Sequence, residues 1–465
     1  MRIGFWISVL AFFLGLTFQA SSQYVTQTSP LPEGREKYGA VVVGNYVYVI
    51  GGYTEKEHYT RSVIRAEIMP GGQLGPWFDC PSLPDKRAYI ANSTFSDQNR
   101  IYVIGGFDGE KPRNTVIWTY ISNDGNLARW RESRPFPKPG LRSLTALSTG
   151  GYLLVIGGCT LNQKPTDKVY MGSLVPNGDV NTWVQGPSLP RPLWAHHAAA
   201  LNGRVWVWGG LADSSYTSAT KEVFSAPIQG EGIIGNWRNE SVSLPSAFYH
   251  GASIGMGYYL LTFCVCYTGG KGSSDIYYSQ VDRGGLSEWS RFDSGLPMDL
   301  HVAVAPDYTR NNVYIPGGKV HKSNREVLEN RVFLFRVSRE KKQIPRSQSS
   351  AVIDSSQLKG FVNYEEARNI LAEGNKPLAC YFHDSTSPDC SSQVSRMHAS
   401  PNFREITEKA VFVLVDTIKS PTLAQQFGIF RTPAWIFYHT DETIAKTHYG
   451  VLSVKQIQDI VESLK

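Results

Sequence analysis

The sequence predicts an all-β six-bladed β-propeller over residues 23–338, followed by an α/β domain over residues 351–465. Three features predict the propeller: Gly-Gly pairs, single tryptophans and β-branched runs recur with one shared period. The first glycines of the first four pairs are separated by 54, 52 and 52 residues, and the next clear pair follows after 108 residues, which is two periods. A four-stranded unit repeated at this spacing is typical of propeller blades, because a single blade cannot bury both of its faces.

The Gly-Gly pairs end short apolar runs such as YVYVIGG and IYVIGG, which are typical of buried strands. Glycine suits a point where the chain leaves a strand with backbone geometry that a side chain would block. In the fifth unit the run YLLTF leads into Cys264, where the pair has been replaced. The pairs stand at Gly51-Gly52, Gly105-Gly106, Gly157-Gly158, Gly209-Gly210 and Gly317-Gly318.

The tryptophans mark the fourth strand of each unit. They are 53, 53, 54 and 52 residues apart, at Trp77, Trp130, Trp183, Trp237 and Trp289. We expect them to pack between neighbouring blades and to stabilise the ring rather than to bind a ligand. The β-branched third strands, such as DKVYMGSL and KEVFSAPI, lie between each glycine pair and its tryptophan.

The two ends of the propeller sequence complement each other. The sixth unit has its third strand over 332–337, but the polar stretch REKKQIPRSQSS follows where its tryptophan strand is due. Near the N-terminus, Tyr24-Val25-Thr26 and the turn Pro30-Leu31-Pro32 resemble an isolated fourth strand with its Leu-Pro turn. We therefore predict that this segment completes the last blade, which removes two open sheet edges.

The first 22 residues have the pattern of a cleaved signal peptide. Arg2 precedes an apolar stretch over 3–18, and small residues before and at Ser22 suit cleavage after it. The apolar core is shorter than the roughly 20 residues that span a bilayer. We expect an exported protein, secreted or periplasmic, without a membrane span. A net charge of +6 without a dense basic run predicts no nucleic-acid partner.

The glycine doublet followed some 25 residues later by tryptophan resembles the kelch repeat family over residues 24–338. Only some units carry an aromatic residue in the third strand, such as Tyr170, Phe224 and Tyr277, so the resemblance is to a divergent kelch-like group. It implies the fold and leaves the activity open, because kelch propellers include binding modules, oxidases and sugar-isomerising enzymes.

Propellers bind ligands at the mouth of the central channel. Counting from each Leu-Pro turn into the next inner strand places six residues there: Tyr38, Tyr89, Arg142, His197, His250 and His301. Such groups could hold a glycan or a protein by stacking and charge-assisted hydrogen bonds. Alternatively they only fill the channel, or the three histidines bind a metal. No carboxylate pair with fixed spacing supports an acid–base assignment.

After a charged, Ser-rich linker over 339–350, apolar strands alternate with helices, which predicts an α/β sandwich. The phrases KPLACYFHDSTSPDC, VFVLVD and FGIFRTPAWIFY resemble the thioredoxin family, with Pro433 at the position of the family's cis-proline. The Cys-x-x-Cys centre of the family is replaced by Ser387-Pro-Asp-Cys390, and Tyr381 stands where the family has a buried Asp. The resemblance implies no two-thiol redox activity. A single-thiol site at Cys390 and a docking surface both stay open.

Together these features predict an exported binding protein. Its propeller would bind a glycan or protein, and the thioredoxin-like domain would bind a second protein partner. We expect no cofactor and no metal. The alternative is an enzyme, sugar-isomerase-like or metal-dependent, with its active site in the propeller mouth. In a eukaryotic host, Asn92 and Asn239 would be glycosylation acceptors.

Overall fold

The computed structural model describes residues 25–337, except 98, 123, 150, 230–231, 283–284, 293, 298, 300, 309 and 323–324. Toward the C-terminus it describes 361–362, 376–384, 388–417, 429, 432–439 and 444–464. The predicted signal peptide, the predicted linker and Ser387 lie outside the described residues.

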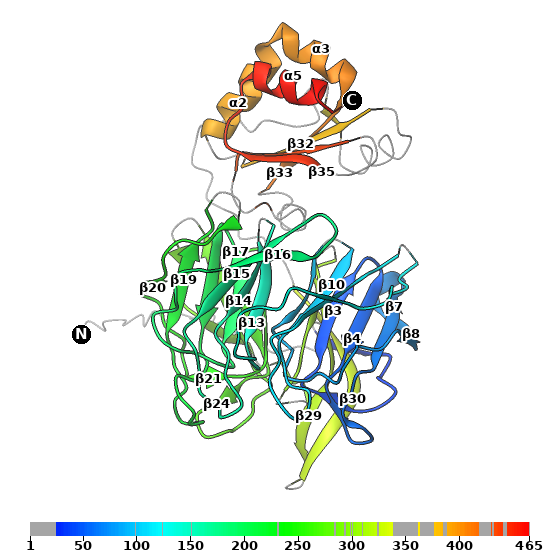
Figure 1. The fold of residues 1–465 in the computed structure, drawn as a ribbon, viewed down its shortest axis with the longest axis vertical. Coiled ribbons are helices and arrows are strands. Elements are labelled where there is room, and N and C mark those ends of the chain that lie inside the picture. The colour runs from blue at the N-terminus through cyan, green and yellow to red at the C-terminus, as the bar shows by residue number, and fades with distance from the viewer. Residues whose placement is uncertain are drawn as a thin grey trace, which may run out of the picture.

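Six antiparallel sheets, called blades one to six below, follow one another along residues 25–337 (Figure 1). Blade one has β3 (Gly39–Val43), β4 (Tyr46–Ile50), β7 (Val63–Ile68) and β8 (Leu74–Cys80). Blade two has β9 (Thr94–Asp97), β10 (Arg100–Ile104), β11 (Val116–Tyr120) and β12 (Arg131–Ser133). Blade three has β13 (Thr145–Thr149), β14 (Tyr152–Ile156), β15 (Val169–Leu174) and β16 (Val180–Gln185).

Blade four has β17 (His197–Leu201), β18 (Arg204–Trp208), β19 (Val223–Pro227) and β20 (Arg238–Asn239). Blade five has β22 (Ala252–Met256), β23 (Tyr259–Phe263), β25 (Ile276–Asp282), β26 (Gly285–Leu286) and β27 (Ser290–Phe292). Blade six has β28 (Ala305–Asp307), β29 (Asn312–Lys322), β30 (Arg325–Arg336) and β1 (Val25–Thr28). Short pairings join β2 (Arg35–Glu36), β5 (Tyr53–Thr54) and β6 (His58–Tyr59), and β21 (Phe248–Tyr249) with β24 (Cys266–Tyr267).

The blades form a closed ring. Inner strand β3 contacts β9 and β28, β13 contacts β9 and β17, and β17 contacts β22. A shared core cluster that includes Ile254, Val304 and Phe335 joins blades five and six. Strand β1 is the outer strand of blade six, with Val25 opposite Phe335 and Thr28 opposite Val332. The described residues thus support the all-β, propeller-like prediction.

Tyrosines of the second strands join neighbouring blades. The Tyr48 hydroxyl donates to the Gly125 carbonyl at 2.7 Å, and Tyr102 donates to Gly178 at 2.9 Å. In blade six the Tyr314 hydroxyl donates to Gly72 at 2.8 Å. Each accepting carbonyl belongs to the turn before the outer strand of the next blade. These bonds satisfy phenol groups that would otherwise be buried at a cost in stability.

The tryptophan ladder also lies between blades, as predicted. The indole N–H of Trp130 donates to the Pro81 carbonyl of the preceding blade at 2.8 Å. Trp77, Trp183 and Trp237 donate in the same way to Ser29, Arg134 and Pro187. Trp289 differs, because its buried indole nitrogen has no hydrogen-bond partner among the described residues.

Two adjacent histidines lie in the interior of blade four. His196 and His197 are fully buried, and their four ring nitrogens have no hydrogen-bond partner among the described residues. The His197 ring stacks on Trp208 with centroids 5.9 Å apart and meets Phe248 at 5.5 Å. Burial lowers the pKa of both histidines to about 3, because a charged imidazole would lose its hydration there.

The C-terminal part has a five-stranded mixed sheet. Its order is β31 (Phe361–Val362), β33 (Val411–Asp416), β32 (Leu378–His383), β34 (Ala434–Tyr438) and β35 (Ile444–Tyr449), of which β31 and β32 run parallel to β33. The described helices are α2 (Pro388–Ala399), α3 (Pro401–Lys409) and α5 (Val454–Glu462).

All three helices contribute to a core with one face of this sheet, in which Met397, Phe403 and Ile457 lie with Tyr381 and Trp435. Ser453 caps α5 through a reciprocal capping box with Gln456. The thioredoxin resemblance stays a prediction. Among the described residues, no helix is long and apolar enough to cross a membrane.

The tryptophan ladder contains its own matched control. We expect Trp130→Phe to lower the free energy of unfolding by about 1–3 kcal/mol more than Trp289→Phe. The first substitution deprives the Pro81 carbonyl of its donor, whereas the second removes an indole N–H that has no described partner. Urea denaturation of the two variants and the unsubstituted protein measures this difference. Equal losses would contradict the proposed role of the indole hydrogen bond.

The buried histidines predict a loss of stability in acid. Their pKa is lower in the folded chain than the 6.5 of a free imidazole, so the unfolded chain takes up their protons first. Their contribution is complete above pH 6.5 and is lost progressively as the pH falls toward 3. His197→Phe removes one of the two protons that are taken up on unfolding. Between pH 6 and 4 it should reduce the slope of the free energy of unfolding against pH by roughly 1.4 kcal/mol per pH unit. Denaturation at several pH values, with exposed His58→Asn as control, checks this; an unchanged slope would refute it.

Candidate functional site

Six equivalent residues surround the axis of the propeller, one just before the inner strand of each blade. All six have a positive φ, between 49° and 58°, which places a non-glycine residue in the left-handed region. They are Lys37, Tyr89, Ser143, Ala195, His250 and His301. Because each residue occupies the same backbone conformation at the same point of its blade, their side chains are brought to one mouth of the channel.

Backbone hydrogen bonds link these residues to one another around the axis. The Tyr89 N–H donates to the Lys37 carbonyl, the Ala195 N–H to Ser143 and the His250 N–H to Ala195, each at 2.8 Å. The Lys37 N–H donates to the His301 carbonyl at 3.1 Å, which connects blade one to blade six. We call these residues the axial ring. These four bonds join Tyr89, Lys37 and His301 in one chain and His250, Ala195 and Ser143 in another.

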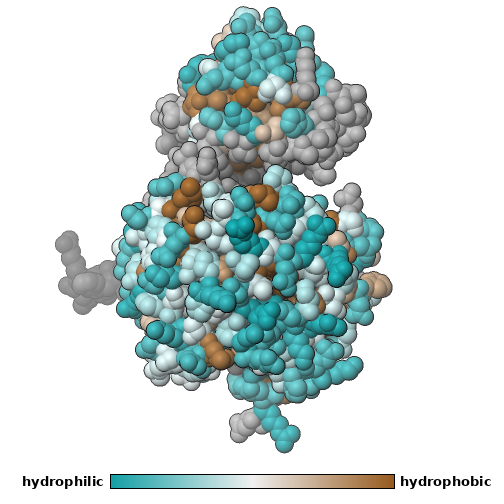
Figure 2. All heavy atoms as spheres, viewed as in Figure 1, coloured by the Kyte–Doolittle hydropathy of each residue, from teal (hydrophilic) through white to brown (hydrophobic). Residues whose placement is uncertain are grey.

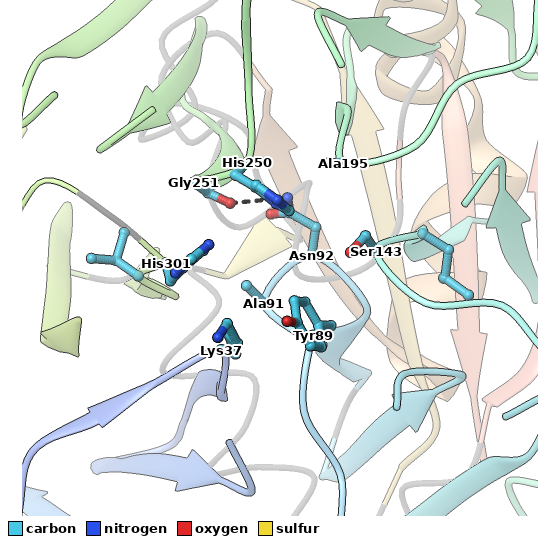
Figure 3. A pocket seen from close by; sticks show the side chains of 11 residues that line it. Lys37, Tyr89, Ala91, Asn92, Ser143, Ala195, His250, Gly251 and His301 are labelled. Carbon is cyan, nitrogen blue, oxygen red and sulfur yellow. Dashed lines mark hydrogen bonds between the residues drawn. The ribbon is translucent and has the colours of Figure 1, made fainter. Parts of the chain in front are cut away.

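A small pocket lies inside the axial ring, with a volume of about 40 Å³. Figure 3 shows its labelled side chains around one opening: Lys37, Tyr89, Asn92, Ser143, His250 and His301. The Asn92 amide crosses from blade two to blade five. It donates to the Gly251 carbonyl at 3.2 Å and accepts from the Ser253 N–H at 3.1 Å. These bonds across the axis use the Asn92 amide, which also lines the pocket.

The structure brings together three of the six predicted mouth residues, Tyr89, His250 and His301. The other three predictions miss the ring by one or two residues. The residue with a positive φ changes the direction of the chain. Side-chain positions counted along a regular strand are therefore shifted beyond this point. Lys37, Ser143 and Ala195 occupy the ring in blades one, three and four. The positive-φ position has no fixed residue type, and the sequence carried no signal for it.

Tyr38, Arg142 and His197 do not line this pocket. Tyr38 is fully buried and donates to the Ala303 carbonyl at 3.3 Å, and burial raises its pKa. His197 packs in the blade interior, so the three histidines do not meet as a metal site would require. Arg142 lies beside the mouth without lining the pocket. Its guanidinium carbon is 5.0 Å from the Tyr89 ring centroid and 5.5 Å from that of Phe107.

Aromatic rings surround the pocket on two sides. On the side of blades one and two, the Tyr59 ring packs edge-on against Tyr53 and Phe107, with ring centroids 5.5 and 5.4 Å apart. The centroids of Phe107 and Tyr89 are 6.2 Å apart. On the side of blades four and five, Trp194, Tyr216, Tyr249 and His250 form a second group with centroids 5.1–6.0 Å apart. We call the two groups the aromatic rim. Tyr216 is its most exposed member, with 45% of its surface accessible.

One carboxylate, Glu36, lies in the mouth. Its oxygens accept from Lys37 Nζ and His301 Nδ1, each at 2.7 Å, and Lys319 Nζ is 3.7 Å away. Burial alone would raise the pKa of Glu36, but the hydrogen bonds and positive charge of His301 and Lys37 lower it to about 2. Glu36 is thus ionised and held by its neighbours. The described residues contain no cluster of three or more His, Cys, Asp or Glu that could hold a metal ion.

The predicted redox candidate lies in the C-terminal part. Cys390, in the first turn of α2, is fully buried, and its Sγ accepts from the Asp384 N–H at 3.4 Å. The second cysteine of this part, Cys380, is buried in β32, and burial raises its pKa to about 12. The Thr432–Pro433 peptide bond is cis. A single-thiol site at Cys390 stays a prediction.

Comparison with known proteins points to one repeat family. The Kelch motif model matches residues 35–65, which span the first glycine pair. The chain is 28% identical over 193 residues to Kelch repeat and BTB domain-containing protein 12 of Danio rerio, covering 38% of this chain and 30% of the relative. It is 24% identical over 208 residues to Kelch-like protein terF of Aspergillus terreus, covering 43% of this chain and 44% of the relative.

Beta-scruin of Limulus polyphemus is 24% identical over 201 residues, covering 41% of this chain and 21% of the relative. The chain thus spans less than half the length of each of these relatives. The motif, the relatives and the ring of four-stranded sheets together support the kelch-repeat family for the β-rich part of the chain.

Proposed function

We propose that this protein is a binding protein whose propeller mouth holds a protein ligand. The observation that carries the proposal is a small, open pocket of about 40 Å³ inside a broad rim of aromatic and cationic side chains. Pockets that enclose a small molecule hold roughly 300–1,000 Å³. A rim around a small depression suits a macromolecular surface instead. The kelch-repeat relatives suggest a protein-interaction role as well.

The composition of the aromatic rim supports this choice. Tyrosine, tryptophan and arginine are enriched among the residues that contribute most to binding in protein interfaces. Tyrosine and tryptophan also bury a large area with little loss of conformational freedom. Here Tyr59 is the last residue of β6, and Tyr216 and Arg142 lie outside the named strands. In the view of Figure 2, polar residues cover most of the side of the propeller, and apolar side chains are scattered.

An enzyme in the mouth is less well supported. A catalytic acid or base needs a proton that it can gain or lose near neutral pH. The mouth carboxylate, Glu36, is already bound by Lys37 and His301, and its pKa of about 2 lies far below that range. A glycan ligand would require exposed ring faces beside a pocket that admits a sugar. The small pocket volume favours the protein ligand.

The finer parts of the function are proposals too. We propose that the protein is exported, secreted or periplasmic, on the strength of its first 22 residues. We also propose that the thioredoxin-like domain is a docking unit for a second protein partner rather than a redox enzyme. The burial of Cys390 supports this choice, because an attacking thiol must be accessible.

Substitutions at two opposite points of the aromatic rim test the proposal. The full chain is purified from its native compartment together with the proteins bound to it. The amount of these bound proteins should be lower by about tenfold or more for the Tyr59→Ala/Tyr216→Ala variant, because both rim anchors are lost. The matched control is Phe78→Ala, which truncates an aromatic residue that is 57% exposed on outer strand β8. Quantitative mass spectrometry of the bound proteins gives the readout.

Retention of all partners by the rim variant, or their loss with Phe78→Ala instead, would contradict the proposal. Binding to a glycan array that is lost with the rim variant, without any protein partner, would assign the mouth to glycans. Equal melting temperatures of the two variants show that the comparison reports binding.

A further inference from the structure

Hydrogen-bonding groups in the pocket are left unused by the fold. The Ser143 hydroxyl lines the pocket and is buried without a hydrogen-bond partner among the described residues. The Lys37 ammonium carries three donors, and the described residues show one of them bonded to Glu36. The imidazole of His250 stands beside them, with its ring centroid 5.2 Å from that of His301. The two sides of the pocket thus both offer groups that can donate to an acceptor.

Positive charge gathers around these donors. Lys37 Nζ lies 5.1 Å and the Arg142 guanidinium carbon 5.0 Å from the centroid of the same Tyr89 ring. Glu36 neutralises Lys37, but it is shared with His301 and Lys319. Among the described residues, no carboxylate lies within ion-pair distance of Arg142. Burial, and then the charges of His301, Lys37 and Arg142, hold the pKa of His250 well below its usual range.

The size of the pocket limits what can enter it. A volume of about 40 Å³ is a few times the roughly 10–15 Å³ that a cavity needs to hold one water molecule. A planar carboxylate at the end of a side chain fits a space of this size. Asn92, whose hydrogen bonds span the axis, also lines this space. A small anionic group presented from outside the mouth suits this space and these donors.

We infer that the pocket binds a single carboxylate of the protein ligand, presented by an Asp or Glu side chain or by a chain terminus. One carboxylate oxygen accepts from Lys37 Nζ and the other from the Ser143 hydroxyl. Arg142 adds positive charge at the side, and the uncharged His250 imidazole lies at the rear. The aromatic rim covers the flanking residues of the ligand. This inference rests on the proposed function, and it names the group that the mouth recognises.

A double-mutant cycle tests the contact. Short random peptides are first selected on the immobilised full chain, and each acidic residue of a selected peptide is then replaced by Asn or Gln. On the unsubstituted protein, one such replacement should weaken binding by about tenfold or more, as expected for a charge-assisted pair. On Lys37→Gln the same replacement should have little effect, because its partner is already gone. Lys111→Gln is the control, because Lys111 is exposed on a loop of blade two. On this variant, replacing the acidic peptide residue should still weaken binding by about tenfold.

Ser143→Ala gives a second cycle that does not change the charge, and melting temperatures verify that each variant is folded. Selected peptides without a coupled acidic residue, or a phosphoserine replacement that binds more tightly than the acid, would overturn the inference. If the selected peptides in that case bind the Tyr59→Ala/Tyr216→Ala variant more weakly than the unsubstituted protein, the mouth remains the interaction surface. If they bind that variant equally well, or if no peptide is selected, the proposed function falls as well.

Discussion

The axial ring is the constraint on which the rest of the mouth depends. Six inner strands start close to one axis, and each is preceded by a non-glycine residue with a positive φ. A left-handed conformation costs roughly 1–2 kcal/mol for a residue other than glycine. The backbone hydrogen bonds from Lys37 to His301 and from Tyr89 to Lys37 offset this cost by satisfying groups that the axis would otherwise bury. The side chains at the mouth are therefore held in place by the backbone.

Most of the propeller could be predicted because its signals are periodic. A repeated blade repeats its core, so glycine pairs and tryptophans revealed the sheets, and the missing outer strand pointed to the N-terminal segment that pairs with β30. The mouth was predicted only in part. The ring residues have an irregular backbone conformation and no preferred residue type. Counting along the sequence from the Leu-Pro turn therefore selected Tyr38 instead of its neighbour Lys37. Cross-axis contacts such as Asn92 with Gly251 join distant repeats and leave no local pattern.

The mouth combines features that favour binding over chemistry. The carboxylate of Glu36 is engaged by Lys37 and His301, and the pocket is small, with a volume of about 40 Å³. Its aromatic side chains are braced against one another, so little conformational entropy is lost when a ligand covers them. The positive charge beside Tyr89 would favour the acidic partner that we propose and would speed its approach. Shape and charge thus point to the same kind of ligand.

Amide hydrogen exchange of the full chain tests the central claim, that the axial ring holds the mouth rigid. We expect the amides of Tyr89, Ala195 and His250 to exchange as slowly as those in the middle of the blades, because their hydrogen bonds break only when the ring opens. Exchange of these amides at the rate of exposed loops, while the blade cores stay protected, would contradict it.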